Sequence, residues 1–240
     1  LARQLGLENE ILGDLVQDKT PEVRRECAIA LRNSKNPKAP EWWSVLATQH
    51  DGKDRWYLEA LGIGAEGNWD ACLTAWLKRA GEGWNTAVGR DILWRSRAKA
   101  TAGFLARLIQ SAPPGENVAR YFRAFDFLTD ADVQPIMALL AMSEGSGDDT
   151  QKTLIAFESL SRLKDVGALR SGNQAAIAGL LNRLRGTPYF VQTIGHLEIK
   201  ERYPELVSIA VNAPEGQLAF DAMRVLLDKN QTDLLSRELT

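Results

Sequence analysis

The chain has 240 residues, of which 45% are hydrophobic and 25% are charged, and its formal net charge is −2 with an isoelectric point near 5.8. A chain of this length and composition can bury a sizeable core. Its mixed charge disfavours sequence-independent nucleic-acid binding, which depends on a strongly basic surface. No apolar run is long enough to span a bilayer, so we expect no membrane insertion by this segment.

The first informative element is a helical hairpin near the N-terminus. Ile11–Leu15 predicts a short apolar helix that runs into Asp18. Thr20 then suits an N-cap, and Pro21 suits the first helical position, where its missing N–H costs no hydrogen bond. The following apolar residues recur at i, i+4, i+7 and i+8 and predict one buried stripe; they are Val23, Cys27, Ala30 and Leu31.

Similar apolar helical stretches recur along the chain at intervals of about 32 to 36 residues. They are Trp56–Tyr57, Val88–Ile92, Val118–Phe125, Leu154–Leu160, Pro188–Ile194 and Leu218–Leu226. A period of this length is typical of paired helices that bury their apolar faces against neighbouring pairs, and no segment alternates for long enough to demand a strand. We therefore predict a single all-α domain over residues 1–240, an α-α superhelix or HEAT/armadillo-like solenoid of about six helical hairpins.

Both ends of the chain resemble parts of incomplete hairpins. Leu1–Gly6 is typical of the end of a second helix, and Thr232–Leu239 is typical of a first helix without its partner. Terminal repeats normally carry a polar outer face, which neither end shows. We therefore expect the chain to be a fragment of a longer multidomain protein.

Two segments resemble known families. The stretch D-K-T-P-E-V-R-R-E-C-A-I-A-L from Asp18 resembles the HEAT repeat, in which the turn aspartate and the second-helix arginine, here Asp18 and Arg24, bond along the stack. The stretch D-G-K-D-R-W-Y-L-E-A-L-G-I-G-A, residues 51–65, is similar to the HEAT-like region of the PVC-type haem-binding CxxCH proteins. In that dehydrogenase-like bacterial family a β-propeller precedes the repeats and a c-type cytochrome domain follows them.

The second resemblance implies an exported or periplasmic parent protein that handles electrons or sugars. The chain itself contains no C-x-x-C-H, because its two cysteines, Cys27 and Cys72, lie far apart and neither is followed by histidine. We therefore expect no haem or other cofactor on this chain, and two reduced, buried thiols.

All seven tryptophans fall between Trp42 and Trp94. Most of them are expected to fill the hairpin core, because large aromatic side chains dominate core burial; these are Trp42, Trp43, Trp56, Trp69 and Trp76. Adjacent side chains on a helix point about 100° apart, so only one of Trp42 and Trp43 can face the core of its hairpin. We expect the other, which we take to be Trp43, to contact a neighbouring repeat or a partner. Trp84, in a Gly-rich loop, is expected to be the most exposed and to serve as a binding anchor.

Basic residues gather around Trp94, with Asp91 as the only nearby acid; they are Arg90, Arg95, Arg97, Lys99 and Arg107. One interpretation is a solvated helix face. The other is a patch for an anion or an acidic partner, since guanidinium groups beside an indole suit carboxylate, phosphate or sugar ligands. The candidate partner-binding residues are therefore Trp43, Trp84, Arg90, Trp94, Arg95 and Arg97.

No catalytic or metal-binding motif is recognisable. A G-x-G-x-x-G occurs at Gly62–Gly67, but the preceding residues have a helical period, whereas the dinucleotide-binding motif follows a strand. His50 and His196 lie in no motif, and we expect both to be structural. The chain also offers too few His, Cys and clustered carboxylates for a metal site.

Two functional hypotheses remain. The first is a non-catalytic module that binds a protein partner or orients other domains of its own polypeptide. The second is a helical-repeat DNA-binding protein of the alkylpurine glycosylase type, which resembles this chain in architecture and uses tryptophans with an aspartate and an arginine in a basic groove. The acidic isoelectric point and the mixed charge favour the first.

Overall fold

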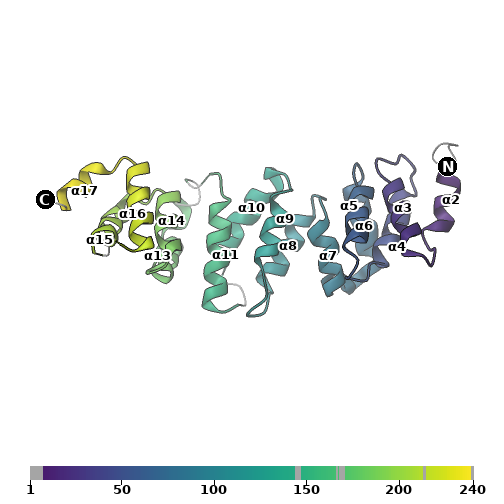
Figure 1. Cartoon of the computed structure of the whole chain (residues 1–240), viewed down its shortest axis with the longest axis horizontal. Coiled ribbons are helices and arrows are strands. Elements are labelled where there is room, and N and C mark those ends of the chain that lie inside the picture. Colours follow the sequence, from purple (N-terminus) through teal and green to yellow (C-terminus); the bar gives the residue numbers. More distant parts are fainter. Residues whose placement is uncertain (1–7, 144–146, 166, 168–170, 213–214, 239–240) are drawn as a thin grey trace. The chain divides into compact units, whose positions relative to one another are not determined.

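The computed structural model describes residues 8–143, 147–165, 167, 171–212 and 215–238, and these residues form α-helices, two 3-10 helices and connecting turns, with no strand among them. Figure 1 shows the helices in chain order. Their bounds are α2 Glu8–Leu15, α3 Pro21–Ala30, α4 Ala39–Thr48, α5 Arg55–Gly64, α6 Trp69–Ala80, α7 Ala87–Arg95, α8 Thr101–Gln110, α9 Ala119–Phe125, α10 Asp130–Ala141, α11 Asp149–Ser161, α13 Gln174–Leu184, α14 Pro188–His196, α15 Tyr203–Asn212, α16 Gln217–Asp228 and α17 Thr232–Glu238, with 3-10 helices η1 Gly81–Asn85 and η2 Lys200–Arg202. The all-α prediction is confirmed.

The contacts divide the chain into two compact units. Unit 1 comprises the residues up to Leu108 together with Arg120–Asp132, and unit 2 comprises Ile109–Ala119 and the residues from Val133 onward. Each predicted apolar stretch lies in or directly before a helix, from α3 through α5, α7, α9, α11 and α14 to α16. The single superhelix over the whole chain stays a prediction. The expected helix at Leu1–Gly6 lies outside the described residues, whereas the one expected at the C-terminus is α17.

In unit 1, consecutive helices from α2 to α5 pack against one another, and alternate helices from α3 to α7 also pack together. The pairs α3 with α5, α4 with α6 and α5 with α7 are the contacts expected when hairpins stack. Hydrogen bonds between equivalent places in neighbouring hairpins strengthen this stacking: Asn68 Nδ2 donates to Ser34 O at 2.9 Å across 34 residues, and Arg79 Nε donates to Ser44 Oγ at 3.0 Å across 35 residues. These separations agree with the predicted period.

Helix α3 follows the prediction in position and differs from it in two details. Its buried residues are Cys27 and Ala28, followed by Leu31, whereas Val23 and Ala30 are only half-buried. The Asp18 carboxylate accepts the amide of Thr20 at 2.7 Å, so Arg24 binds the main-chain oxygen of Asp18 instead, also at 2.7 Å. An ion pair between neighbouring hairpins joins Arg25 Nη1 to Asp54 Oδ2 at 3.6 Å.

The glycines of the G-x-G-x-x-G stretch have packing roles. A Cβ at Gly64 would lie 2.1 Å from Ala28 O, so this glycine lets α5 approach the backbone of α3. A Cβ at Gly62 would lie 2.1 Å from the guanidinium carbon of Arg95. Gly67 has a φ of +81°, a left-handed conformation that favours glycine, in the turn after α5. The stretch therefore lies in a helix and its C-terminal turn, and no strand precedes it between residues 8 and 61.

Unit 2 has its own core, to which α13, α14, α15 and α16 each contribute large apolar side chains. Among the most deeply buried are Leu184, Phe190, Ile194, Leu206 and Leu226. The helices α14 and α16 pack together, as do α15 and α17, which repeats the packing of alternate helices seen in unit 1. Gly195 permits the close contact of α14 with α16, since a Cβ there would lie 2.7 Å from Val225 Cγ1.

Candidate binding surfaces

Two of the predicted tryptophan anchors are less available than expected. Trp43 is 1% exposed and donates its indole N–H to Leu61 O at 2.8 Å, so it is a core residue, and its selection as a partner-binding residue is wrong. The prediction failed because adjacency alone does not decide which of two neighbouring side chains faces inward, and here Trp42 is the half-buried one. Trp84 lies in η1 and is half-buried, with its ring edge-on to Phe104 at 5.1 Å between centroids.

The structure places Trp56 on the surface, where the sequence predicts a core residue. Its side chain is 72% exposed at the start of α5, because the buried stripe of this helix runs through Tyr57, Leu61 and Gly64. The helix starts at this register because the Asp54 carboxylate accepts the amide of Tyr57 at 3.0 Å. A helical projection that starts from Tyr57 and Leu61 would have shown Trp56 off the core face.

The predicted arginine cluster separates into distinct environments. Arg90 Nε bonds Asn85 Oδ1 at 3.0 Å, and Arg107 lies over the ring of Phe104 at 5.3 Å. Arg95 crosses Gly62 to bond Glu59 Oε2 at 2.9 Å. Arg97, after the end of α7, occupies a cavity described below.

Trp56, Glu59, Trp94, Arg95 and Arg120 define what we call the α5/α7 face. Trp56 and Glu59 are three residues apart on α5, so they share one side of that helix. On α7, Trp94 donates its indole N–H to Arg120 O at 3.0 Å, while the Arg120 guanidinium lies 5.7 Å from the Trp94 ring centroid and pairs with Asp91 at 2.6 Å. Salt bridges thus hold both arginines of this face, and a cation–π contact holds Arg120 beside the Trp94 indole.

A second feature of unit 1 is a cavity of about 440 Å³ at the turns between helices, which we call the turn cavity. Three successive turns contribute to it: the α5–α6 turn, the α7–α8 turn and the α9–α10 turn. The side chains that decide its chemistry are Trp69, Asp70, Arg97, Lys99, Phe127 and Asp132. The Asp70 carboxylate accepts the amide of Lys99 at 2.8 Å and so joins two of the turns.

Arg97 is the unusual group in the turn cavity. Its Nη1 donates to Ser96 O at 2.7 Å and to Trp94 O at 3.2 Å, and its guanidinium lies 4.5 Å from the Phe127 ring centroid. Burial lowers the pKa of Arg97 to about 10, and the nearby charge of Arg95 adds to this effect. Arg97 still carries a full positive charge near neutral pH.

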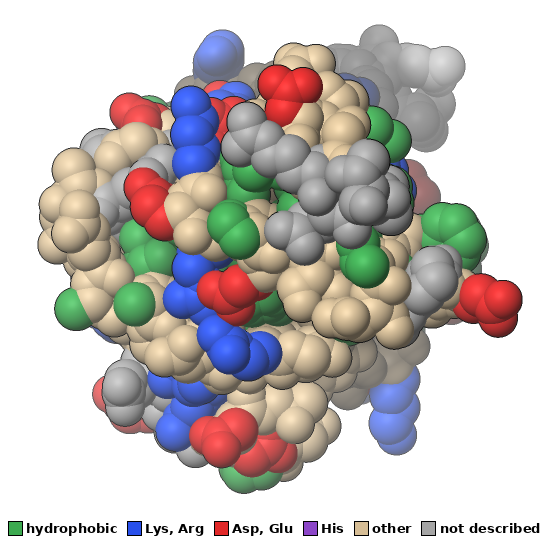
Figure 2. Space-filling model, turned by 90° about the vertical axis from the view of Figure 1, so that its left-hand side faces the viewer, with side chains coloured by type: hydrophobic (Ala, Val, Ile, Leu, Met, Phe, Trp, Pro, Cys, Tyr) green, Lys and Arg blue, Asp and Glu red, His purple; other side chains and the backbone are tan. Residues whose placement is uncertain are grey.

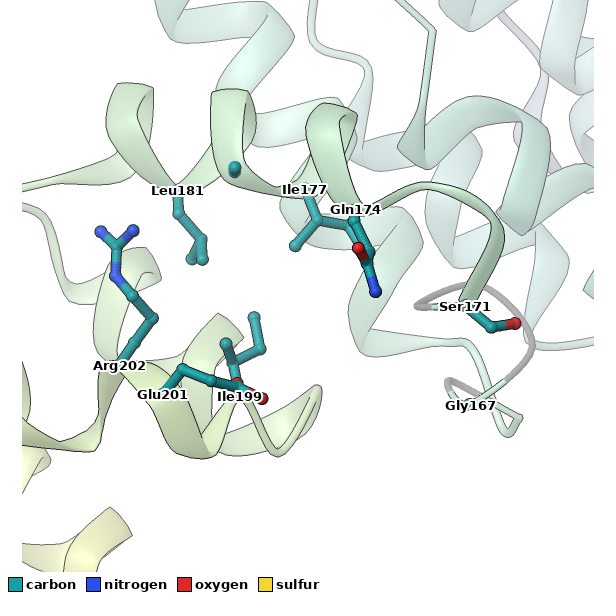
Figure 3. A pocket seen from close by; sticks show the side chains of 9 residues that line it. Gly167, Ser171, Gln174, Ile177, Leu181, Ile199, Glu201 and Arg202 are labelled. Atoms are coloured by element: carbon teal, nitrogen blue, oxygen red, sulfur yellow. The ribbon is translucent and has the colours of Figure 1, made fainter.

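Unit 2 contains a cavity of about 550 Å³ between α13 and η2. Figure 3 shows Ile177 and Leu181 of α13 directed toward Ile199, which lies next to η2. Arg202 also lines this cavity, but its guanidinium is held by Glu205. The cavity therefore offers mainly apolar contacts.

The basic side chains of unit 2 lie close to acidic ones. On the face shown in Figure 2, a band of Lys and Arg side chains runs from top to bottom with Asp and Glu beside it. Arg185 binds Glu205 at 2.9 Å, and Lys229 binds Glu198 at 2.6 Å. These pairs neutralise charge that a nucleic-acid backbone would otherwise attract.

The histidines and cysteines form no reactive cluster. His50 is buried with Nε2 3.7 Å from Asp91 Oδ2, and His196 is an exposed residue at the end of α14. Cys27 and Cys72 are free and buried, and burial raises the pKa of Cys72 to about 12. Across the described part of the chain, no group of three or more His, Cys, Asp and Glu is placed to hold a metal ion, and no helix is long and apolar enough to cross a bilayer.

Comparison with protein-family models, curated proteins and solved structures finds no match to this chain.

Proposed function

We propose that this chain is a non-catalytic module that binds a protein, either a separate partner or another domain of its own polypeptide, through the α5/α7 face. The observation that carries the proposal is the 72% exposure of Trp56 on α5. The helix α7, which packs against α5, carries Trp94 and Arg95. Tryptophan and arginine are the residues that most often dominate the binding energy of protein interfaces. An indole that is 72% exposed contributes little to the packing of unit 1.

The salt bridges of the α5/α7 face support this proposal. Arg95 and Arg120 are each held by a carboxylate, from Glu59 and Asp91 respectively, so their positions are set before a partner arrives. Fixed side chains lose less conformational entropy on binding than free ones. The face therefore combines large contact groups with a low ordering cost.

We further propose that the chain belongs to the HEAT-like region of an exported PVC-type haem-binding protein. The support is the sequence resemblance over residues 51–65, where Asp54 caps α5 and where Tyr57, Leu61 and Gly64 pack against neighbouring helices. These residues of the resemblance therefore cap and pack the helix α5. The flanking sequence of the full-length gene product tests it: a downstream C-x-x-C-H and an upstream export signal support membership, and their absence argues against it.

Capture from an extract of the source cells tests the binding role. The purified chain is immobilised beside the variants Trp56→Ser and Phe220→Ser, of which the second removes a comparably exposed aromatic residue from unit 2, 62% exposed. We expect a protein retained by the chain and by Phe220→Ser and lost with Trp56→Ser. Equal retention by all three would argue against the α5/α7 face.

The DNA-binding alternative predicts a different result. A helical-repeat glycosylase would retain duplex DNA at low ionic strength and release it as salt increases. Because many arginines here are ion-paired, among them Arg32 with Glu66 at 2.6 Å, we expect no salt-sensitive retention of labelled duplex in a fluorescence anisotropy titration. Salt-sensitive binding would favour the alternative over the protein-binding proposal.

A further inference from the structure

We propose that the turn cavity of unit 1 is a binding site for a peptide carboxylate that has an aromatic or aliphatic side chain beside it. The site goes beyond the proposed function, since it is lined by the turns after α5, α7 and α9 and does not include Trp56.

The positive charge of Arg97 favours an anion in the turn cavity. Within the described part of the chain, no carboxylate lies within ion-pairing distance of its guanidinium, whose polar contacts are the two main-chain oxygens that accept from Nη1. The two acids that line the cavity have other partners, since Asp70 accepts the amide of Lys99 at 2.8 Å and Asp132 accepts the hydroxyl of Thr129 at 2.6 Å. A half-buried cation with no carboxylate at ion-pairing distance is stabilised by an anion that enters the cavity.

Two further groups favour an anion at the same place. Lys99 is exposed, and among the described residues its ammonium group forms no hydrogen bond or ion pair with another side chain. The first turn of α6 also lines the cavity, and the Asn68 side chain accepts no hydrogen bond from the amides of this turn, while its Nδ2 donates to Ser34 O. The amides of Trp69, Asp70 and Ala71 are therefore left to bind an oxyanion.

The other lining residues select the kind of anion. Asp70 and Asp132 also line the cavity and would repel a phosphate dianion more strongly than a singly charged carboxylate. Trp69 and Phe127 provide aromatic surface, and Phe127 is 65% exposed although it forms part of the wall. The volume of about 440 Å³ lies within the range of small-ligand sites. A carboxylate next to an apolar side chain satisfies each of these features.

The amides of Trp69, Asp70 and Ala71 provide direct reporters in a two-dimensional NMR titration of the ¹⁵N-labelled chain. The probes are N-acetylphenylalanine, which carries the carboxylate, its neutral amide, and phenyl phosphate. A fourth probe, N-acetylglutamyl-phenylalaninamide, presents the carboxylate on a side chain, so comparison with the first distinguishes a peptide C-terminus from an acidic side chain as the source.

We expect N-acetylphenylalanine or the glutamyl probe to shift these amides saturably, and the neutral amide to leave them unchanged. Arg97→Gln should weaken the affinity about tenfold or more, and Lys99→Gln by about threefold, as expected for charge-assisted bonds. Arg107→Gln is the matched control, because Arg107 also lies over a phenylalanine ring but outside the cavity, and it should not change the affinity.

Three results would overturn the proposal. They are equal binding of the neutral amide, tighter binding of phenyl phosphate than of either carboxylate, and the absence of saturable shifts at these amides. Since the exposed Lys99 ammonium forms no ion pair within the described part of the chain, Lys99→Gln should fold normally and still decides the matter if Arg97→Gln fails to fold. Trp56→Ser should leave all these titrations unchanged. A negative result for the turn cavity therefore does not bear on the proposal that the α5/α7 face binds a protein.

Discussion

Replacing Gly64 with alanine tests the reason for the glycine-rich stretch most sharply. An added Cβ would lie 2.1 Å from Ala28 O, a backbone atom that moves only if α3 and α5 separate. Overpacking of this kind costs about 1–3 kcal/mol. Alanine is favoured over glycine in a helix by about 0.5–1 kcal/mol, which offsets part of that cost. We therefore expect Gly64→Ala to lower the free energy of unfolding of unit 1 by about 0–2.5 kcal/mol, the difference between the two effects.

Gly103→Ala is the matched control, because Gly103 lies in α8 and nothing is within 4 Å of its added Cβ. It should gain the helix preference alone and stabilise by up to about 1 kcal/mol. Urea unfolding followed by tryptophan fluorescence measures both variants in unit 1 alone, since all seven tryptophans precede its boundary at Leu108. Stabilisation by Gly64→Ala equal to that by Gly103→Ala would refute the close packing of α3 against α5.

The remaining predictions concern buried and exposed side chains. Trp43→Phe should destabilise unit 1 by about 1–3 kcal/mol in the same urea assay, because it leaves Leu61 O buried without its donor. Trp56→Ser should change the free energy of unfolding by less than about 0.5 kcal/mol, as is usual for an exposed site, and should remove the most red-shifted part of the emission spectrum. The thiols of Cys27 and Cys72 should resist a chromogenic disulfide reagent until urea unfolds the chain. Because burial raises the pKa of Cys72 from 9.0 to about 12, its contribution to stability should be complete below pH 9 and decline toward pH 12 in unfolding curves measured across that range.

The fold class and the helix positions follow from the sequence because stacking hairpins repeat one arrangement of caps and apolar stripes. Thr20 and Pro21, for example, mark the start of α3, which begins at Pro21. The face that each helix buries is harder to predict. A helix that packs against neighbours on two sides has many apolar positions, and their pattern does not show which of them faces solvent. Trp43 and Trp56 both lie in apolar helical segments, yet Trp43 is buried and Trp56 is exposed.

The turn cavity could be predicted only in part. The sequence marks Arg97 and Lys99 as members of a basic cluster, and the structure retains both in one cavity. The sequence gives no sign that Phe127 belongs to this cavity. Phe127 lies in the α9–α10 turn, 30 residues from Arg97, and contacts Arg97 because successive hairpins place their turns side by side. Aligning the turn sequences of successive hairpins would have placed Arg97 and Phe127 at neighbouring positions.

The central claim is that the chain acts by binding through the α5/α7 face, and photo-crosslinking inside the source cells tests it most directly. A benzoylphenylalanine residue at position 56 of the full-length protein reaches a separate partner or a domain of the same polypeptide, whereas extract capture finds only the former. The same residue at position 220 is the control. The account predicts a discrete cross-linked peptide, identified by mass spectrometry, from position 56 and none in common with position 220. No cross-link at position 56, or the same products from both positions, would contradict it.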